Sequence, residues 1–226
     1  MNIAMEVSTK DCTSLADAAL AEMADISTDS PSGYEAGFLS KQREDWVLVT
    51  DARDSGKLRG FALSTLERIG GTPSLLVGVA SFTRTAVADP ALRAVMGDLY
   101  RRALLAFPDE DVLVGTRVLD PSAFRAFAGL DEVVPRRDHR ASGEERAWGR
   151  RLAKRFGAEG QLDDRTFVLR GDGDPCGALD YAPRKPAKVA PQYETFFTCL
   201  DAARHDSLVA FGWAMAEDLA AHSLPR

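Results

Sequence analysis

Residues 75–107, LLVGVASFTRTAVADPALRAVMGDLYRRALLAF, are the stretch of the sequence that decides the fold. The apolar first part predicts a buried strand, and the second part has the period of an amphipathic helix. We expect Asp89 to cap this helix, Pro90 to be its first residue and Pro108 to help end it. The apolar face of the helix contains Leu92, Val95, Met96, Leu99, Tyr100, Ala103 and Phe107.

Short β-rich segments lie on both sides of this stretch. Strands over Trp46–Thr50 and Gly60–Leu66 flank the turn signal RDSG and predict an antiparallel hairpin, which the strand Leu75–Thr85 extends. The strand Val112–Thr116 returns after the long helix, and such a crossover makes it parallel to Leu75–Thr85. We therefore predict one mixed, mostly antiparallel sheet flanked by helices, a fold between the α+β and α/β classes.

The remaining segments are less regular. Residues 14–26 predict a helix with one buried face, and residues 138–160 have the charge order that suits another helix. Residues 164–171 predict a strand, residues 171–177 a loop, and residues 181–194, with their prolines, a linker. The aromatic run from Tyr193 is strand-like, and periodicity leaves open whether the last segment is a strand or a helix. We expect a core over residues 1–136 and a C-terminal part, 137–226, that completes the same domain.

Composition excludes several classes of protein. At 226 residues and 45% hydrophobic content the chain can bury a real core, and its net charge of −6 argues against a general nucleic-acid binder. It has no basic leader followed by an apolar run, and no uncharged apolar stretch of about 18 residues. We expect a cytoplasmic protein without a membrane anchor. The widely spaced Cys12, Cys176 and Cys199 predict reduced thiols and no metal site.

The segment DPSAFRAFAGL, residues 120–130, resembles a family motif of the form NxxAxxLYxKxGF, with Asp120 at the Asn, Ala123 at the Ala and Phe127 at the Tyr. Together with the order of elements over about Leu15–Arg136, this resembles the GCN5-related N-acetyltransferase (GNAT) superfamily. The resemblance implies a V-shaped opening, formed by the fourth strand and the helix that follows it, which holds acyl-CoA. It also implies that the splayed centre of the sheet orients the thioester and the attacking amine of a small molecule.

The resemblance also implies where each part of the site lies. Acetyl-CoA or another acyl-CoA would contact the end of the strand and the start of the long helix, at Ala80, Phe82, Arg84, Thr85, Asp89 and Arg93. Glu67 is the acidic residue of the central strands and is a candidate general base, although a solvent-exposed position beside Arg68 is the commoner reason for a glutamate there. Tyr100, or a water molecule, would protonate the leaving thiolate.

The sequence departs from the family pattern at two places. The family's pyrophosphate loop resembles Q/RxxGxG/A, whereas this chain has RTAVAD at residues 84–89, without the glycines that let amides approach an anion. Phe127 has no proton to give. In addition, the carboxylate of Asp89 would occupy the position of a phosphate oxygen and repel it, so we expect weak CoA binding or none.

Two hypotheses about function follow. The first is a divergent acyltransferase that moves an acyl group from acyl-CoA to a small-molecule amine. The second is a GNAT-like binding or interaction module that has lost acyl transfer and forms a homodimer through its C-terminal aromatic segment. The basic runs Arg136–Arg140 and Gly149–Arg155 are either a solvated surface or a contact for the 3′-phosphate of CoA or an acidic partner.

Overall fold

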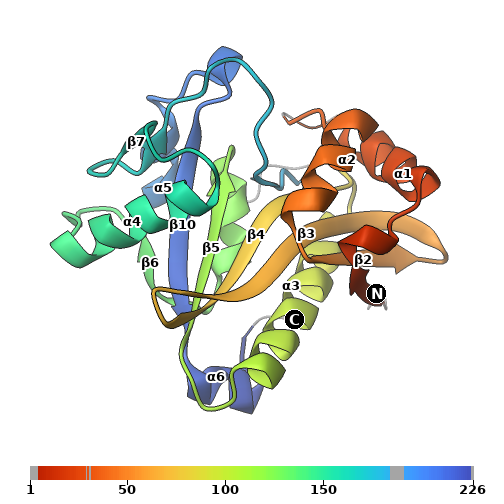
Figure 1. The fold of residues 1–226 in the computed structure, drawn as a ribbon, viewed down its shortest axis with the longest axis horizontal. Helices are drawn as coiled ribbons and strands as arrows, with labels where there is room; N and C mark the ends of the chain where they lie inside the picture. The colour runs from red at the N-terminus through yellow and green to blue at the C-terminus, as the bar shows by residue number, and fades with distance from the viewer. Residues whose placement is uncertain (1–4, 29, 31, 184–190, 225–226) are drawn as a thin grey trace.

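The computed structural model describes residues 5–28, 30, 32–183 and 191–224, and these form one mixed ten-stranded sheet (Figure 1). The main path of the sheet runs β1-β2-β3-β4-β9-β5-β10-β8-β7, and β6 pairs with β10. Strands from both sides of residue 136 thus belong to one sheet. The strands are β1 (Glu6–Asp11), β2 (Leu48–Asp54), β3 (Lys57–Ile69), β4 (Thr72–Phe82), β5 (Val112–Val118), β6 (Asp131–Val134), β7 (Leu162–Asp163), β8 (Val168–Leu169), β9 (Leu179–Asp180) and β10 (Ser207–Ala214).

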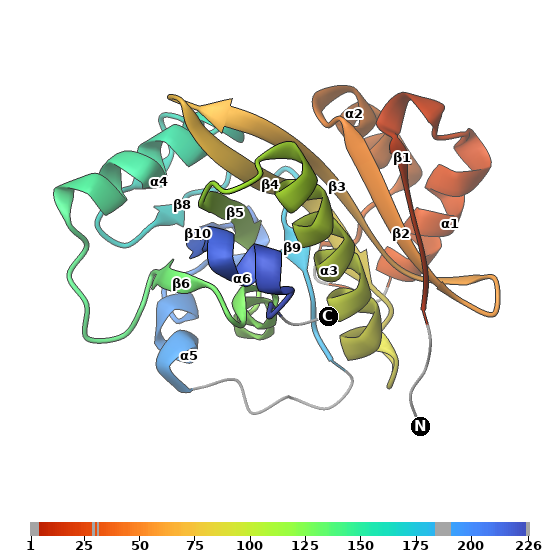
Figure 2. The ribbon, with the colours of Figure 1, turned by 90° about the horizontal axis from the view of Figure 1, so that it is seen from below.

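Helices cover both faces of this sheet. Figure 2 shows α1, α2 and α4 on one side and α3 and α6 on the other. The helices are α1 (Asp17–Ser27), α2 (Ala36–Asp45), α3 (Ala88–Ala106), α4 (Gly143–Arg155), α5 (Pro191–Phe197) and α6 (Ala216–Ala221), with short 3₁₀ helices η1 (Cys12–Ser14), η2 (Pro121–Phe127) and η3 (Ala202–Arg204). None of the described helices is both long and apolar enough to cross a membrane.

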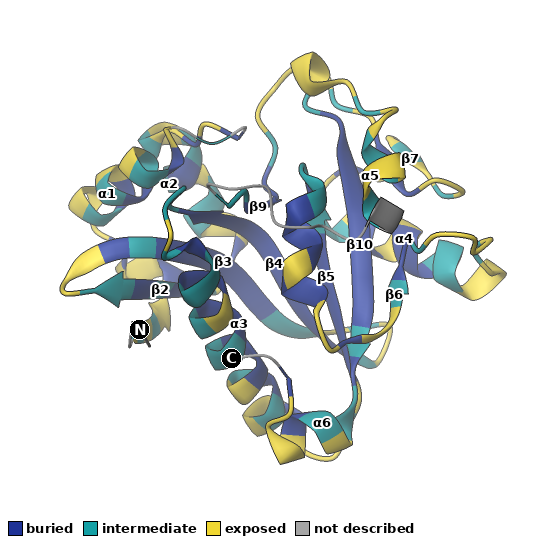
Figure 3. Cartoon of the chain, turned by 180° about the vertical axis from the view of Figure 1, so that it is seen from behind, coloured by how far each residue is buried: buried dark blue, intermediate teal, exposed yellow. Residues whose placement is uncertain are grey.

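The centre of the sheet confirms the predicted topology. β2, β3 and β4 form an antiparallel meander, and β5 returns parallel to β4, from Ser74 opposite Leu113 to Val77 opposite Thr116. β4 is buried along almost its whole length, as Figure 3 shows, because helices pack on both of its faces. The predicted apolar face of α3 is buried from Leu92 to Ala103, so the period of the sequence placed this helix correctly.

The expected start of α3 is wrong. The helix begins at Ala88, with Val87 as the N-cap residue and no side-chain cap, so Asp89 lies inside the first turn. The amide of Ala88 donates a hydrogen bond to the carbonyl of Thr85, and this tight turn starts the helix earlier than the position of Pro90 suggests. The carboxylate of Asp89 therefore points to other partners, described below.

Several peripheral elements differ from the sequence-based expectation. β1, α2 and β9 were not predicted. The aromatic run from Tyr193 belongs to α5 and is helical, because Tyr193, Phe196 and Phe197 lie on one helical face. Phe124 of η2 stacks on Tyr193 with 4.0 Å between ring centroids. The last segment contains both alternatives, the strand β10 followed by the helix α6.

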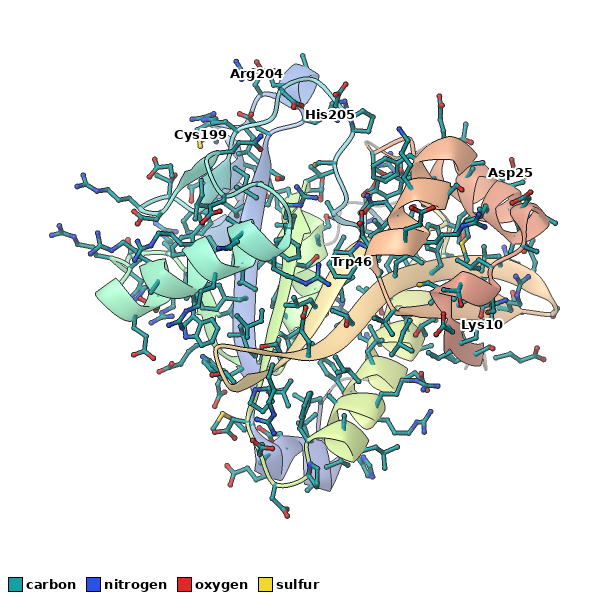
Figure 4. The ribbon with its side chains drawn as sticks, viewed as in Figure 1. Lys10, Asp25, Trp46, Cys199, Arg204 and His205 are labelled. Carbon is teal, nitrogen blue, oxygen red and sulfur yellow. The ribbon has the colours of Figure 1, made fainter. Side chains whose placement is uncertain are left out.

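β4 contains a bulge at Gly78. Val79 pairs with Leu63 and Val77 with Ser64, so Gly78 has no partner in β3. The ring of Trp46 covers this position, and a Cβ built on Gly78 would lie 1.8 Å from Trp46 Cε2. Figure 4 shows Trp46 between α2 and the central strands. The bulge directly follows Val77, the last residue of β4 that pairs with β5.

We predict that Gly78→Ala destabilises the protein by about 1–3 kcal/mol, because the added methyl group overlaps the Trp46 ring. The free energy of unfolding in urea measures this loss. Gly160→Ala is the matched control, since nothing lies within 4 Å of a Cβ there. Equal stabilities of the two variants would contradict the close packing of Trp46 on the bulge.

Candidate functional site

The strongest candidate site is the place where β4 and β5 diverge. The two parallel strands pair directly up to Val77 and Thr116, and beyond these residues β9 lies between them. Leu179 pairs with Ala80 of β4 and with Val118 of β5, and Asp180 pairs with Ser81. Figures 2 and 3 both show β9 in this gap. We call the space between the diverging ends of β4 and β5 the cleft.

β9 and the residues before it fill the cleft and form backbone hydrogen bonds with β4. The amide of Ala80 donates a hydrogen bond of 2.9 Å to the carbonyl of Ala178. The chain enters beside the bulge, where a Cβ on Gly177 would lie 2.7 Å from the carbonyl oxygen of Gly78. Ala178 and Leu179 are 0% and 1% exposed, so this backbone has no contact with bulk solvent.

Two residues between α1 and α2 hold β9 from outside the sheet. The hydroxyl of Tyr34 donates to the carbonyl of Ala178 and accepts from its amide, both at 2.9 Å. Burial, followed by the charge of Asp180, raises the pKa of this hydroxyl far above its ordinary value, so Tyr34 stays neutral. The amide of Ser32 donates to the Asp180 carboxylate at 3.0 Å, and the Ser32 hydroxyl also bonds to it.

The strand ends near the start of α3. Tyr181 packs edge-on against Phe82, with 6.0 Å between ring centroids, and is 1% exposed. Burial, with the nearby charge of Asp89, raises the pKa of Tyr181 to about 12. The chain thus runs beside β4 from the bulge at Gly78 to the first turn of α3.

The first turn of α3 contains a negatively charged side chain, that of Asp89. The carboxylate of Asp89 accepts from Arg125 Nε at 2.6 Å and lies 2.8 Å from Arg93 Nη2. Burial acts to raise the pKa of Asp89, but the hydrogen bonds and charges of Arg125 and Arg93 outweigh it and hold the pKa below its ordinary value. A carboxylate at a helix N-terminus and between two guanidinium groups is in the environment that a phosphate would seek.

The residues that the resemblance assigns to the cofactor therefore lie together. Ala80 and Phe82 contact the chain around β9, and Asp89 and Arg93 form the ion-paired turn of α3. Arg84 and Thr85 lie in the turn between β4 and α3, where the amide of Thr85 donates to the carbonyl of Thr83. Their role toward a cofactor stays a prediction.

The two catalytic candidates lie outside the cleft. Glu67 is opposite Ser74, at the start of β4, and accepts from Arg155 Nε at 2.6 Å. Tyr100 donates to the carbonyl of Ala126 at 3.0 Å, and burial raises the pKa of its hydroxyl. The structure does not bring either group to the cleft occupied by β9.

The basic runs are largely engaged within the molecule. Arg150 pairs with Asp164, and Arg151 stacks over Trp148 with its Cζ 4.6 Å from the ring centroid. Arg136 and His139 both bond to Glu145. This pattern is typical of a surface held by local ion pairs rather than of an open phosphate site.

Two hollows lie elsewhere in the described structure. A cavity of about 210 Å³ lies between the ends of β6 and β8 and α5, and includes Cys199. A more open groove of about 360 Å³ runs beside Trp148 and Trp213. Among the described residues, no group of three or more His, Cys, Asp and Glu side chains is arranged to hold a metal ion. Cys12, Cys176 and Cys199 are free cysteines.

The sequence pattern missed β9 and its partner Tyr34. A two-residue strand has no measurable period, and Tyr34 and Ala178 are 144 residues apart. The one local signal is the short run GALDY, in which apolar residues follow Gly177 and precede Pro183.

Comparisons with known proteins give only distant likenesses. No family model matches the sequence, and no curated protein matches it. The structure is similar to aminoglycoside 6′-acetyltransferase type Ii, with 12% identity over 57% of this chain and 86% of that chain and a TM-score of 0.42. It is similar to the ribosomal-protein-S18-alanine N-acetyltransferase of Escherichia coli, with 13% identity over 62% and 86% and a TM-score of 0.40. A GNAT acetyltransferase of Streptococcus pneumoniae matches at 12% identity over 62% and 92%, with a TM-score of 0.38. These likenesses are too distant to say what this chain binds or does.

We predict that Asp89→Asn lowers stability by about 0.5–1 kcal/mol at pH 7, the range of a partly exposed ion pair. The folded-state pKa of Asp89 lies below the ordinary 3.8, so the pair stabilises the fold above that pH. This contribution is lost as the pH falls through the folded-state pKa. Urea unfolding at pH 7 and pH 3 should therefore show a smaller difference at the lower pH.

Asp25→Asn is the control for this measurement, because Asp25 is exposed at the end of α1 and points outward in Figure 4. It should change stability by less than about 0.5 kcal/mol at either pH. A loss in Asp89→Asn that stays constant from pH 7 to pH 3 would show that charge is not its cause.

Proposed function

We propose that this chain is a GNAT-like binding module whose acyl-donor cleft is occupied by its own strand β9, so that it does not transfer acyl groups in this conformation. The observation that carries the proposal is the hydrogen bond from the Ala80 amide to the Ala178 carbonyl inside the cleft. The resemblance to the GNAT superfamily assigns acyl-CoA to the fourth strand and the start of the next helix, and its thioester to the splayed centre of the sheet. Here β9 pairs along β4 in that splayed centre.

The position of β9 supports this proposal through backbone chemistry. An extended cofactor arm in the cleft would need the free edges of β4 and β5, because only these offer unpaired amides and carbonyls. Ala80 and Val118, which would flank such an arm, already pair with Leu179 or its neighbour. A free arm and β9 therefore exclude each other.

The charge of Asp89 at the start of α3 also supports the proposal. The Asp89 carboxylate occupies the anion position between Arg93 and Arg125, and it would repel a pyrophosphate there. The chain thus supplies substitutes for both parts of an acyl-CoA molecule, an extended backbone for its arm and a carboxylate for its phosphates. Neither substitute depends on a bound ligand.

A second candidate is transfer of an acyl group from acyl-CoA to the amine of a small molecule. The parallel β4–β5 pair and the buried helix α3 favour it, since they retain the architecture that the resemblance associates with this chemistry. It requires β9 to leave the cleft, and it requires a proton acceptor other than Glu67 in its present ion pair.

Isothermal titration calorimetry with CoA and acetyl-CoA tests the proposal on the wild-type protein. We expect no binding up to about 1 mM, because mass action must first displace β9. A thiol-release assay with acetyl-CoA and a panel of primary amines should likewise show no turnover. Micromolar binding together with thiol release would overturn the proposal in favour of the acyltransferase.

The variant Asp89→Gly tests the anion position at the start of α3 separately from the occupancy of the cleft by β9. The substitution removes the carboxylate and leaves Arg93 and Arg125 available to phosphate, so inorganic pyrophosphate, which does not need the cleft, should bind at least about tenfold tighter. The matched variant is Asp98→Gly, which removes another arginine-paired carboxylate of α3 and should leave pyrophosphate binding unchanged. If Asp89→Gly also leaves pyrophosphate binding unchanged, the role assigned to Asp89 is wrong.

A further inference from the structure

We propose that β9 together with Ala178, the residue before it, is a displaceable strap, and that Ser32 and Tyr34 form the clamp that holds this strap in the cleft. The cleft then has a second, open state, which is reached when the hydrogen bonds from Ser32 and Tyr34 to the strap break. The inference rests on the proposed function in one respect, since it takes β9 to be the occupant of the acyl-donor cleft. It adds that the occupancy is reversible and is controlled from outside the sheet.

The clamp holds the strap at two points. Tyr34 bonds to both backbone groups of Ala178, and Ser32 bonds through its amide and its hydroxyl to Asp180. Tyr34 is itself fixed by the parallel stacking of its ring on Phe38 of α2, with 5.1 Å between centroids. Movement of Tyr34 would therefore remove two of the hydrogen bonds that hold the strap at its entry to the cleft.

The sheet does not need the strap for its own integrity. β4 pairs with β3 from Phe82, opposite Gly60, to Thr72, opposite Ile69. β5 pairs with β10 from Val118, opposite Leu208, to Val112, opposite Ala214. The two strands also pair directly below the cleft, up to Val77 and Thr116. β9 adds only two register positions on β4 and one on β5. Its departure would leave these three ladders in place.

The fit of the strap is incomplete where it faces β4. Asp180 and Ser81 are opposite one another in the register, and Asp180 Oδ1 and Ser81 Oγ are buried without a hydrogen-bond partner. Both residues are at most 2% exposed. Buried polar atoms without partners disfavour the state that buries them, and water would reach both atoms once the strap lifts. The closed state therefore depends on the clamp more than it would if every buried polar atom of the strap had a hydrogen-bond partner.

The clamp holds the strap from outside the sheet. Ser32 and Tyr34 lie between α1 and α2, and Gln42 of α2 is close to the same part of the chain, with its Oε1 3.1 Å from a Cβ built on Gly177. A shift of Tyr34 would release the strap without any group entering the cleft. The position of Tyr34 and the opening of the cleft are then linked equilibria.

Hydrogen–deuterium exchange of the full-length protein tests the strap directly. In Tyr34→Phe we expect the amides of Leu179, Asp180 and Ala80 to exchange at least about tenfold faster, because local opening of the strap exposes them. Ala178 is left out of the comparison, since the substitution removes the partner of its own amide. Amides of β2, β3 and β10 should exchange at the wild-type rate.

Tyr100→Phe is the matched control. It also removes one buried tyrosine hydroxyl that bonds to a backbone carbonyl, but on Ala126 rather than on the strap. It should leave exchange at Leu179 and Asp180 unchanged. Ser32→Ala provides a second, milder release of the strap, and it should accelerate the same amides if Tyr34→Phe does not fold.

The outcomes separate this inference from the proposed function. Unchanged exchange at Leu179 and Asp180 in both variants, or a rise that matches that of β3 and β10, would overturn the strap, because β9 would then open only with the whole fold. Selective acceleration supports it. Titration of CoA into Asp89→Gly and into the double variant Tyr34→Phe/Asp89→Gly then tests the proposed function alone, because both lack the carboxylate that repels phosphate. Tighter binding by the double variant supports the cleft as the donor site, and equal affinities with a rapidly exchanging strap would refute that assignment.

Discussion

Divergence of two parallel strands inside a buried sheet is the constraint on which the rest of this structure depends. Once β4 and β5 separate beyond Val77 and Thr116, each exposes backbone amides and carbonyls in the middle of the core. Such groups must find partners, because a buried unpaired peptide group is strongly unfavourable. Water, a ligand or another part of the chain can supply them. In this protein the chain does so, and the positions of β9, Tyr34 and Ser32 all follow from that solution.

The same principle explains the first turn of α3. A helix start has unpaired amides and a partial positive charge, and two arginines next to it add to this charge. Asp89 neutralises that environment from within the helix and bonds to Arg93 and Arg125. Both the polar edges of the cleft and the positive helix end are therefore satisfied by the protein itself. Both features are therefore complete without a bound molecule.

The elements that sequence could predict are those specified by local periodicity. The stretch 75–107 specified β4 and α3 because its apolar residues repeat at the spacing of each element, and the crossover rule then gave the parallel β5. β9 could not be predicted in this way, since its two residues pair with strands that lie far away in the chain. The aromatic residues of α5 suggested a strand by composition, yet their spacing suits a helix that packs Tyr193 on Phe124. Around β9, the sequence analysis named Ala80 and Asp89 as candidates, a role that stays a prediction, and it did not identify Ala178, whose carbonyl accepts a hydrogen bond from the Ala80 amide.

The covalent attachment of β9 has a consequence for competition. A segment on the same chain as its binding site acts at an effective concentration that for short flexible connections is on the order of millimolar. A free molecule with the same intrinsic affinity for the cleft must therefore reach about that concentration before it occupies half of the sites. Evolution can adjust this threshold without altering any residue of the cleft, simply by changing the length or stiffness of the connections on either side of β9. The concentration at which a free molecule displaces β9 is therefore set by the chain that connects β9 to the sheet as well as by the cleft itself.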